Sequence, residues 1–123
     1  MKVKTNVLSN EALNYAATLA DKGTASVLMD HANVFHTIFS NEENGYIVFT
    51  NYLSWSDAGP VSKREKIDIC YNHVDDTITA TKWLARQNQQ TATCPIVAAM
   101  RCFVESHLGS EVEIPDVLCN SYD

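Results

Sequence analysis

The sequence predicts an α+β fold, in which an antiparallel β-sheet packs with an N-terminal and a C-terminal α-helix. Apolar residues recur at helical spacing near both ends of the chain, whereas alternating apolar and polar residues occupy the middle. Turn-forming Gly, Pro and Asn residues separate these segments. A length of 123 residues is typical of one domain, so we expect a single domain that spans residues 1–123.

The N-terminal helix is expected over about residues 10–22. Ser9 is a favourable N-cap residue, and Glu11 places a negative charge in the first turn, where it complements the helix dipole. Apolar residues then recur at helical spacing, and Gly23 suits the left-handed conformation that ends many helices.

The segment that follows contains three expected strands. Residues 27–29 and 34–39 are compatible with strands, and residues 46–50 are the strongest candidate because most of them are aromatic or β-branched. The polar residues 40–45 predict a turn, so the second and third of these strands should pair as a hairpin.

A second turn and a second hairpin are expected further along the chain. Residues 57–60 read Asp-Ala-Gly-Pro, in which Gly59 tolerates unusual backbone angles and Pro60 restricts the residue before it. Residues 66–71 and 77–83 both alternate between apolar and polar side chains. A polar turn separates the two segments, which predicts that they pair.

The last third of the chain predicts a loop, a helix and a short edge strand. Residues 85–93 are polar and have no apolar anchor, which is typical of a loop. The clearest helix of the chain follows, because Thr93 or Cys94 can cap it, Pro95 suits its first position and Gly109 suits its end. Residues 111–115 alternate and predict an edge strand that Pro115 terminates.

The charge of the chain is negative overall but unevenly distributed. The formal net charge is −6, which disfavours binding of duplex nucleic acid or an anionic membrane, because phosphate binding needs clustered Lys and Arg. Residues 61–101 nevertheless contain six basic and four acidic residues, whereas residues 102–123 contain five acidic residues and no Lys or Arg. We therefore expect neither duplex nucleic acid nor a membrane as a partner, while a small anion remains compatible with the cationic middle.

The residues that could carry catalysis or hold a metal form no familiar pattern. His73 with Asp75 and Asp76 could hold a divalent ion, but acidic residues are also ordinary turn formers. Cys94 stands at a helix N-terminus, where a thiol becomes more reactive, but it has no identifiable base and a capping role explains it equally well. We therefore expect no metal, no cofactor and no nameable catalytic residue, which favours a protein that is not an enzyme.

The cysteines and the start of the chain bear on the cellular compartment. The four cysteines lie 24, 8 and 17 residues apart without a CxxC pair, which is typical of neither a zinc site nor a disulfide framework. We expect free, buried thiols in a reducing cytosol, although an even number leaves disulfides open. The first ten residues do not resemble a secretion signal, and no apolar run approaches the roughly 20 residues that span a bilayer.

A binding site is a better supported hypothesis than a catalytic one. Aromatic side chains, a sharp backbone turn and a guanidinium are the groups needed to hold a planar anionic molecule, and they occur here within a short segment. The alternative is that the aromatic residues belong to the core and the charged ones pair with other charges. The candidate residues of this segment are Tyr52, Trp55, Asp57, Gly59, Pro60, Arg64 and Glu65.

Four segments together resemble one family of phage proteins. These are residues 2–5 followed by the helix that contains residues 12–16, Trp55 with residues 58–60 and 64–67, residues 95–101, and residues 109–115. In this order they resemble the NinX-type family of small proteins that tailed phages and prophages encode, a family of unknown function. Ala58 stands where the family usually has Gly, and Cys94 stands where we expect Thr.

The resemblance implies a small phage-encoded accessory protein that acts in the cytoplasm of the infected bacterium. It also adds Arg101 to the candidate site, in a pocket with Trp55, Gly59, Pro60 and Arg64. The first functional hypothesis is a non-enzymatic protein, compatible with a homo-oligomer, that sequesters a small anionic, nucleotide-like ligand and so counters host defence. The alternative is a protein–protein inhibitor of a host factor that acts through the acidic residues 42–43 and 102–123.

Overall fold

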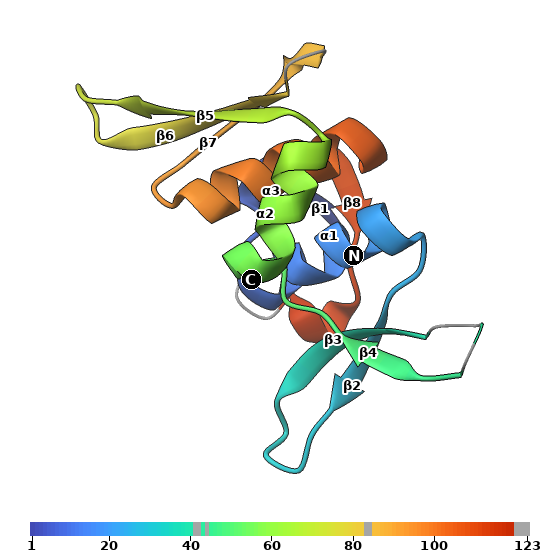
Figure 1. Ribbon diagram of the computed structural model, residues 1–123. Helices are drawn as coiled ribbons and strands as arrows, with labels where there is room; N and C mark the ends of the chain where they lie inside the picture. The colour runs from blue at the N-terminus through green and yellow to red at the C-terminus, as the bar shows by residue number, and fades with distance from the viewer. Residues whose placement is uncertain (41–42, 44, 83–84, 120–123) are drawn as a thin grey trace.

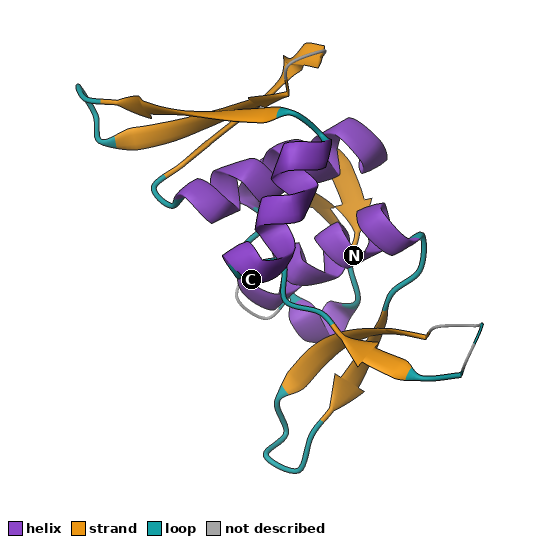
Figure 2. Ribbon diagram, viewed as in Figure 1, coloured by secondary structure: helices purple, strands orange, loops and turns teal. Residues whose placement is uncertain are grey.

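A computed structural model describes residues 1–40, 43, 45–82 and 85–119. Three helices form the middle of the molecule, and two three-stranded sheets project from opposite ends of this helical body (Figures 1 and 2). A third sheet has two strands, which come from the two ends of the chain. The predicted α+β class is confirmed, but the strands are distributed over three antiparallel sheets rather than one.

The C-terminal helix, α3, is the centre of the molecule. It spans Pro95–Leu108, with Cys94 at the N-cap and Gly109 at the C-cap, as the sequence predicts. None of its residues from Pro95 to Ser106 is exposed, because α1, α2 and the strands β5, β6 and β7 all contact it. Six of its residues are buried: Ala98, Ala99, Met100, Cys102, Phe103 and Val104.

The first helix, α1, follows the prediction residue for residue. It spans Asn10–Lys22, with Ser9 at the N-cap. Gly23 ends it with a φ of 80°, a left-handed conformation that a glycine adopts without steric cost. Its buried face packs against α3 and β3.

The sheet of β2, β3 and β4 is attached to α1 through buried polar contacts. Its strands span Ser26–Met29, Phe35–Ser40 and Ile47–Phe49, and β3 lies between the other two. The predicted pairing of β3 with β4 is confirmed; of the predicted turn between them, residues 41, 42 and 44 lie outside the described residues. Asn14 of α1 donates to the Thr50 carbonyl at 2.8 Å and accepts from the Tyr52 backbone N–H at 2.8 Å.

The predicted turn at residues 57–60 is wrong, because these residues lie inside helix α2, which spans Trp55–Arg64. Ser54 caps the helix and accepts a hydrogen bond from the Ser56 backbone N–H at 3.3 Å. Gly59 does not use a positive φ, and Pro60 occupies the helix interior, where its ring normally costs a hydrogen bond. Burial of Ala58 and Val61 on one face of α2 stabilises the helix despite Gly and Pro.

The sheet of β5, β6 and β7 covers part of α3. The hairpin of β5 (Ile67–Asn72) and β6 (Thr77–Lys82) is confirmed, although Trp83, the last residue of the expected strand, lies outside the described residues. The predicted loop at 85–93 is wrong, because β7 spans Ala85–Ala92 and pairs with β6. Backbone hydrogen bonds to β6 hold this polar segment as a strand, and its Gln90 is buried and donates to Glu105 at 2.6 Å.

The two ends of the described chain meet in the two-stranded sheet. The predicted edge strand is confirmed as β8, which spans Glu111–Glu113 and ends before Pro115. Its partner is β1, Lys2–Lys4, which was not expected from the sequence. Short 3₁₀ helices follow both strands, at Thr5–Val7 and Asp116–Leu118.

The helices and the cysteines bear on two expectations from the sequence. Within the described residues, no helix is long and apolar enough to cross a membrane. All four cysteines are free, but the expectation of buried thiols is only half right, because Cys102 and Cys119 are buried while Cys70 and Cys94 are exposed.

Replacing Asn14 tests whether these polar contacts hold the β2–β3–β4 sheet to the body. Asn14→Ala leaves the Thr50 carbonyl and the Tyr52 N–H without their partner, so we expect a loss of about 2–4 kcal/mol in the free energy of unfolding. Urea denaturation measures it. Asn6→Ala, at an exposed asparagine, is the matched control and should change stability by less than about 0.5 kcal/mol; equal effects of the two variants would contradict the account.

Candidate functional site

The residues predicted to form one pocket lie on different parts of the surface. Trp55 and Arg64 stand at opposite ends of α2, nine residue steps apart, which corresponds to about 13 Å of rise and about two and a half turns. They therefore point to opposite sides of the helix. Trp55 is 47% exposed, and Gly59 and Pro60 lie in the helix between the two ends.

Tyr52 and Asp57 serve the structure around α2. Tyr52 is buried, with 3% of its surface exposed, and its hydroxyl donates a hydrogen bond to Asp21. Burial and this carboxylate both raise the pKa of the Tyr52 hydroxyl. Asp57 accepts a hydrogen bond from the Asn51 backbone N–H at 3.0 Å. The Tyr52 ring is thus a core side chain rather than a surface for stacking.

Arg101 lies on the other side of α3 from Arg64. The guanidinium of Arg64 stands 5.9 Å from the ring centre of Phe103, and Phe103 and Arg101 are separated by about 200° around the helix. Arg101 Nε donates to the Leu8 carbonyl at 2.7 Å. The structure therefore does not bring the two arginines together.

A polar cleft of about 520 Å³ lies on the Arg101 side of α3. Glu105, one helical turn after Arg101, lines this cleft, as do residues of β7 and of the two chain ends. The lining residues are Lys4, Asn6, Gln89, Gln90, Thr91, Glu105, Ser110 and Glu111. Its charged groups are one Lys and two Glu, so it offers no excess of positive charge to an anion.

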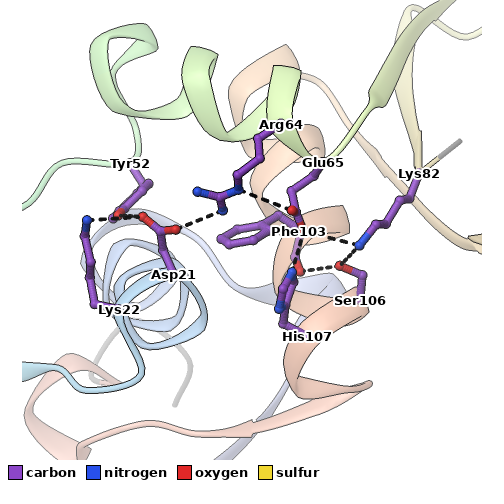
Figure 3. Close-up of polar contacts among 9 residues, drawn as sticks. All are labelled: Asp21, Lys22, Tyr52, Arg64, Glu65, Lys82, Phe103, Ser106 and His107. Carbon is purple, nitrogen blue, oxygen red and sulfur yellow. Dashed lines mark hydrogen bonds and ion pairs between the residues drawn. The ribbon is translucent and has the colours of Figure 1, made fainter. Parts of the chain in front are cut away.

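The charged side chains instead converge on Glu65, at the end of α2 (Figure 3). Arg64 Nε donates to Glu65 Oε2 at 3.3 Å, and Lys82 Nζ donates to Glu65 Oε1 at 3.2 Å. His107 Nε2 contacts the same oxygen, Oε1. We call Arg64, Glu65, Lys82 and His107 the Glu65 cluster; its members come from α2 and the residue after it, β6 and α3.

Further contacts fix the geometry of this cluster. Arg64 lies between two carboxylates, since its Nη2 also donates to Asp21 Oδ1 at 2.9 Å (Figure 3). Lys82 Nζ also donates to the Ser106 hydroxyl at 3.4 Å. The rings of His107 and Phe103 meet edge to face, with their centres 4.8 Å apart. Arg64, Lys82 and His107 are therefore each held by at least two contacts.

The Glu65 carboxylate is the electrostatic centre of the cluster. Its side chain is only 13% exposed, and this burial acts to raise its pKa. The hydrogen bonds from His107, Lys82 and Arg64 outweigh that effect and hold the pKa at about 2. In the same way, burial acts to raise the pKa of Asp21, but the hydrogen bonds from Tyr52 and Arg64 lower it.

Sequence reasoning found Arg64 and Glu65 but missed the other two members. Lys82 could have been found, because the predicted hairpin pairs it with Ile67, two residues after Glu65. His107 had a weaker signal: it lies one turn after Phe103 on the same helix face. Nothing in the sequence indicated that α3 passes beside the end of α2.

The arrangement presents hydrogen-bond donors to solvent but is poorly suited to acid–base catalysis. A carboxyl group with a pKa of about 2 is a weak general base at neutral pH. Arg64 is 53%, His107 38% and Lys82 22% exposed, so solvent reaches all three side chains. Among the described residues, no three His, Cys, Asp or Glu side chains come together in a group that could hold a metal ion, and this includes His73, Asp75 and Asp76.

The acidic residues of the C-terminal segment are partly paired. The amino group of Met1 lies 2.8 Å from a Glu113 carboxylate oxygen and 3.2 Å from an Asp116 carboxylate oxygen. Glu42, which the sequence analysis assigned to an acidic surface, lies outside the described residues. The acidic edge around β8 therefore carries less negative charge than the sequence alone suggests.

Acid unfolding tests the role of Glu65. The pKa of Glu65 is lower in the folded state, so its stabilisation is complete above about pH 4.5 and is lost as the pH falls toward 2. Glu65→Gln should lower the free energy of unfolding by about 2–3 kcal/mol at pH 7. The variant should also lose less stability than the wild type between pH 4.5 and 2. Urea denaturation at several pH values measures both. Glu111→Gln, on an exposed carboxylate, should leave the profile unchanged; an equal effect would refute the assignment.

Thiol labelling tests the placement of the cysteines. Cys70 and Cys94 are exposed, whereas burial raises the pKa of Cys102 to about 11 and so suppresses its reactive thiolate. A thiol reagent at pH 8 should modify two cysteines per folded chain. All four should react after denaturation. Rapid labelling of more than two in the folded chain would contradict the buried positions.

Comparison with known proteins places the chain in a family. The family described as "Bacteriophage P22, NinX" matches residues 4–107, which include both α2 and the whole Glu65 cluster. No curated protein matches the chain. The match covers most of the 123 residues, and the chain therefore belongs to the NinX family of bacteriophage proteins.

Proposed function

We propose that this phage protein is a non-enzymatic accessory protein that binds a small phosphate-bearing anion at the Glu65 cluster. The observation that carries the proposal is the convergence of Arg64, Lys82 and His107 on one half-open surface. Glu65 and Asp21 neutralise two of the three positive charges of Arg64, Lys82 and Lys22. The side chains around Glu65 also provide more hydrogen-bond donors than its two oxygens accept.

Unused donors make the cluster suitable for a second anion. Arg64 uses Nε and Nη2 for the two carboxylates, and among the described residues its Nη1 has no partner. His107 contacts Glu65 through Nε2, which leaves Nδ1 for another group. Charge-assisted hydrogen bonds from a guanidinium to phosphate oxygens are among the stronger polar contacts. Arg64, Lys82 and His107 are held in place before the ligand arrives, so little conformational entropy is lost on binding.

The charged side chains of the Glu65 cluster, rather than an aromatic ring for stacking, indicate the class of ligand. Trp55, which we expected to hold an aromatic ring, points away from Arg64 on α2 and supplies no contact there. The phosphate group is thus the part of the ligand that this geometry favours. A nucleotide-like signal of host defence, sequestered in the cytoplasm of the infected cell, is the source of phosphate that best fits a phage protein.

Calorimetric titration tests the proposal with inorganic phosphate, a cyclic dinucleotide and ADP-ribose. We expect at least one of the two nucleotides to bind. Lys82→Gln should weaken the affinity for that nucleotide about 10-fold or more, which is the effect of losing one charge-assisted hydrogen bond. Lys63→Gln is the matched control, because Lys63 is the exposed neighbour of Arg64 and is not in the cluster. Unfolding curves must show that both variants fold.

Three outcomes would contradict the proposal. No heat with any of the three ligands removes the binding function, and equal effects of the two lysine variants place binding elsewhere. Recovery of a chemically altered nucleotide after incubation would indicate an enzyme. If a host protein is instead recovered in stoichiometric amount by affinity capture, and is released by high salt, the acidic-surface inhibitor becomes the better function.

A further inference from the structure

Strand β4 is an unprotected apolar edge of the β2–β3–β4 sheet. Its residues Ile47, Val48 and Phe49, and Tyr46 before them, are between 37% and 69% exposed. Residues 45–53 contain no Lys, Arg, Asp, Glu or Pro, the residues that commonly protect an edge strand from pairing. No other strand of the described residues pairs with the free side of β4.

The other edge strands differ from β4. β2, the second edge strand of this sheet, also contains no charged residue, but Asp30 follows it directly and only two of its large side chains, Leu28 and Met29, are exposed. β5 is also an edge strand, but Lys66 precedes it and Asp68 lies within it, so it carries charges of both signs. The chain as a whole carries a net charge of −6, which makes most surfaces of two copies repel each other. The β4 edge combines the absence of charge with four exposed large apolar side chains, so two copies can approach along it without that repulsion.

Backbone direction determines which groups this edge offers. The Thr50 N–H donates to the Thr37 carbonyl at 3.2 Å, and Val48 pairs with Phe39, so the backbone groups of Val48 also point toward β3. Neighbouring residues of a strand point their N–H and C=O groups in opposite directions. The groups of Ile47 and Phe49 therefore point away from the sheet.

We propose that β4 pairs antiparallel with β4 of a second copy of this chain, with Val48 of both copies on the two-fold axis. Ile47 of each copy then lies opposite Phe49 of the other. Because both residues point their backbone groups outward, the register allows four hydrogen bonds between the copies. Each Ile–Phe pair also lies on one face, and aromatic with β-branched pairs are favourable across strands. The strand is thus complementary to itself.

The size of this contact predicts a weak dimer. Four half-exposed large side chains present roughly 100 Å² each, about half of the 800 Å² per partner that is typical of a stable interface. We therefore expect a monomer–dimer equilibrium in the micromolar range rather than a permanent dimer.

Sedimentation velocity over about 1–500 µM tests the proposal, which is independent of anion binding. The wild-type chain should dimerise as concentration rises, and Val48→Lys and Val48→Glu should each raise the dimer Kd at least tenfold, because like charges meet at the axis. An equimolar mixture of the two variants should recover dimers, since Lys then faces Glu. Val74→Lys, at a 95% exposed valine of the β5–β6 turn, is the control and should behave as wild type.

The contradicting results are equally specific. A wild-type chain that stays monomeric to 500 µM, roughly the upper end of the micromolar range expected here, overturns the proposal. Dimers that persist in either single Val48 variant, or a mixture that stays monomeric while both variants keep the wild-type circular dichroism spectrum, exclude this register.

Discussion

Burial of α3 on nearly all sides is the constraint on which the rest of the structure depends. A helix with no exposed residue from Pro95 to Ser106 must be covered by other elements, and here α1, α2 and the β5–β6–β7 sheet provide that cover. Each of these elements is small, and a ten-residue helix or a small sheet gains most of its stability from packing against such a partner. Packing against α3 therefore sets the positions of the end of α2 and of strand β6.

The Glu65 cluster is a consequence of that packing. The end of α2, the end of β6 and the last turn of α3 meet at one place, and each contributes a charged side chain (Figure 3). A carboxylate that is 13% exposed would be costly to bury alone, and the hydrogen bonds from Arg64, Lys82 and His107 offset the cost. The same three side chains also face solvent, which connects the structural role of Glu65 to the anion binding that we propose.

The local parts of this fold could be predicted from sequence, whereas the parts that depend on tertiary contacts could not. Helices α1 and α3 and the β5–β6 hairpin follow from caps, periodicity and turns, all of which act between near neighbours. The Asp57–Pro60 segment was assigned to a turn because Gly and Pro disfavour helices. In the structure the burial of Ala58 and Val61 outweighs that preference, and the segment is helical. Strand β7 was missed for a similar reason: its polar sequence has no β pattern, and the backbone of β6 holds it.

The candidate site was also predicted only where its residues are near neighbours in the sequence. Arg64 and Glu65 are adjacent, so a motif reveals them together, but Trp55 and Arg101 share no surface with them in the folded chain.

The central claim is that the Glu65 cluster binds a phosphate-bearing anion. Nuclear magnetic resonance of the Arg64 Nε–H and His107 ring signals during titration with a cyclic dinucleotide tests this claim most directly. The account predicts that both signals shift in a saturable way while Lys63 signals do not. Saturable shifts confined to other residues, such as Gln89 and Thr91 of the polar cleft, would contradict it.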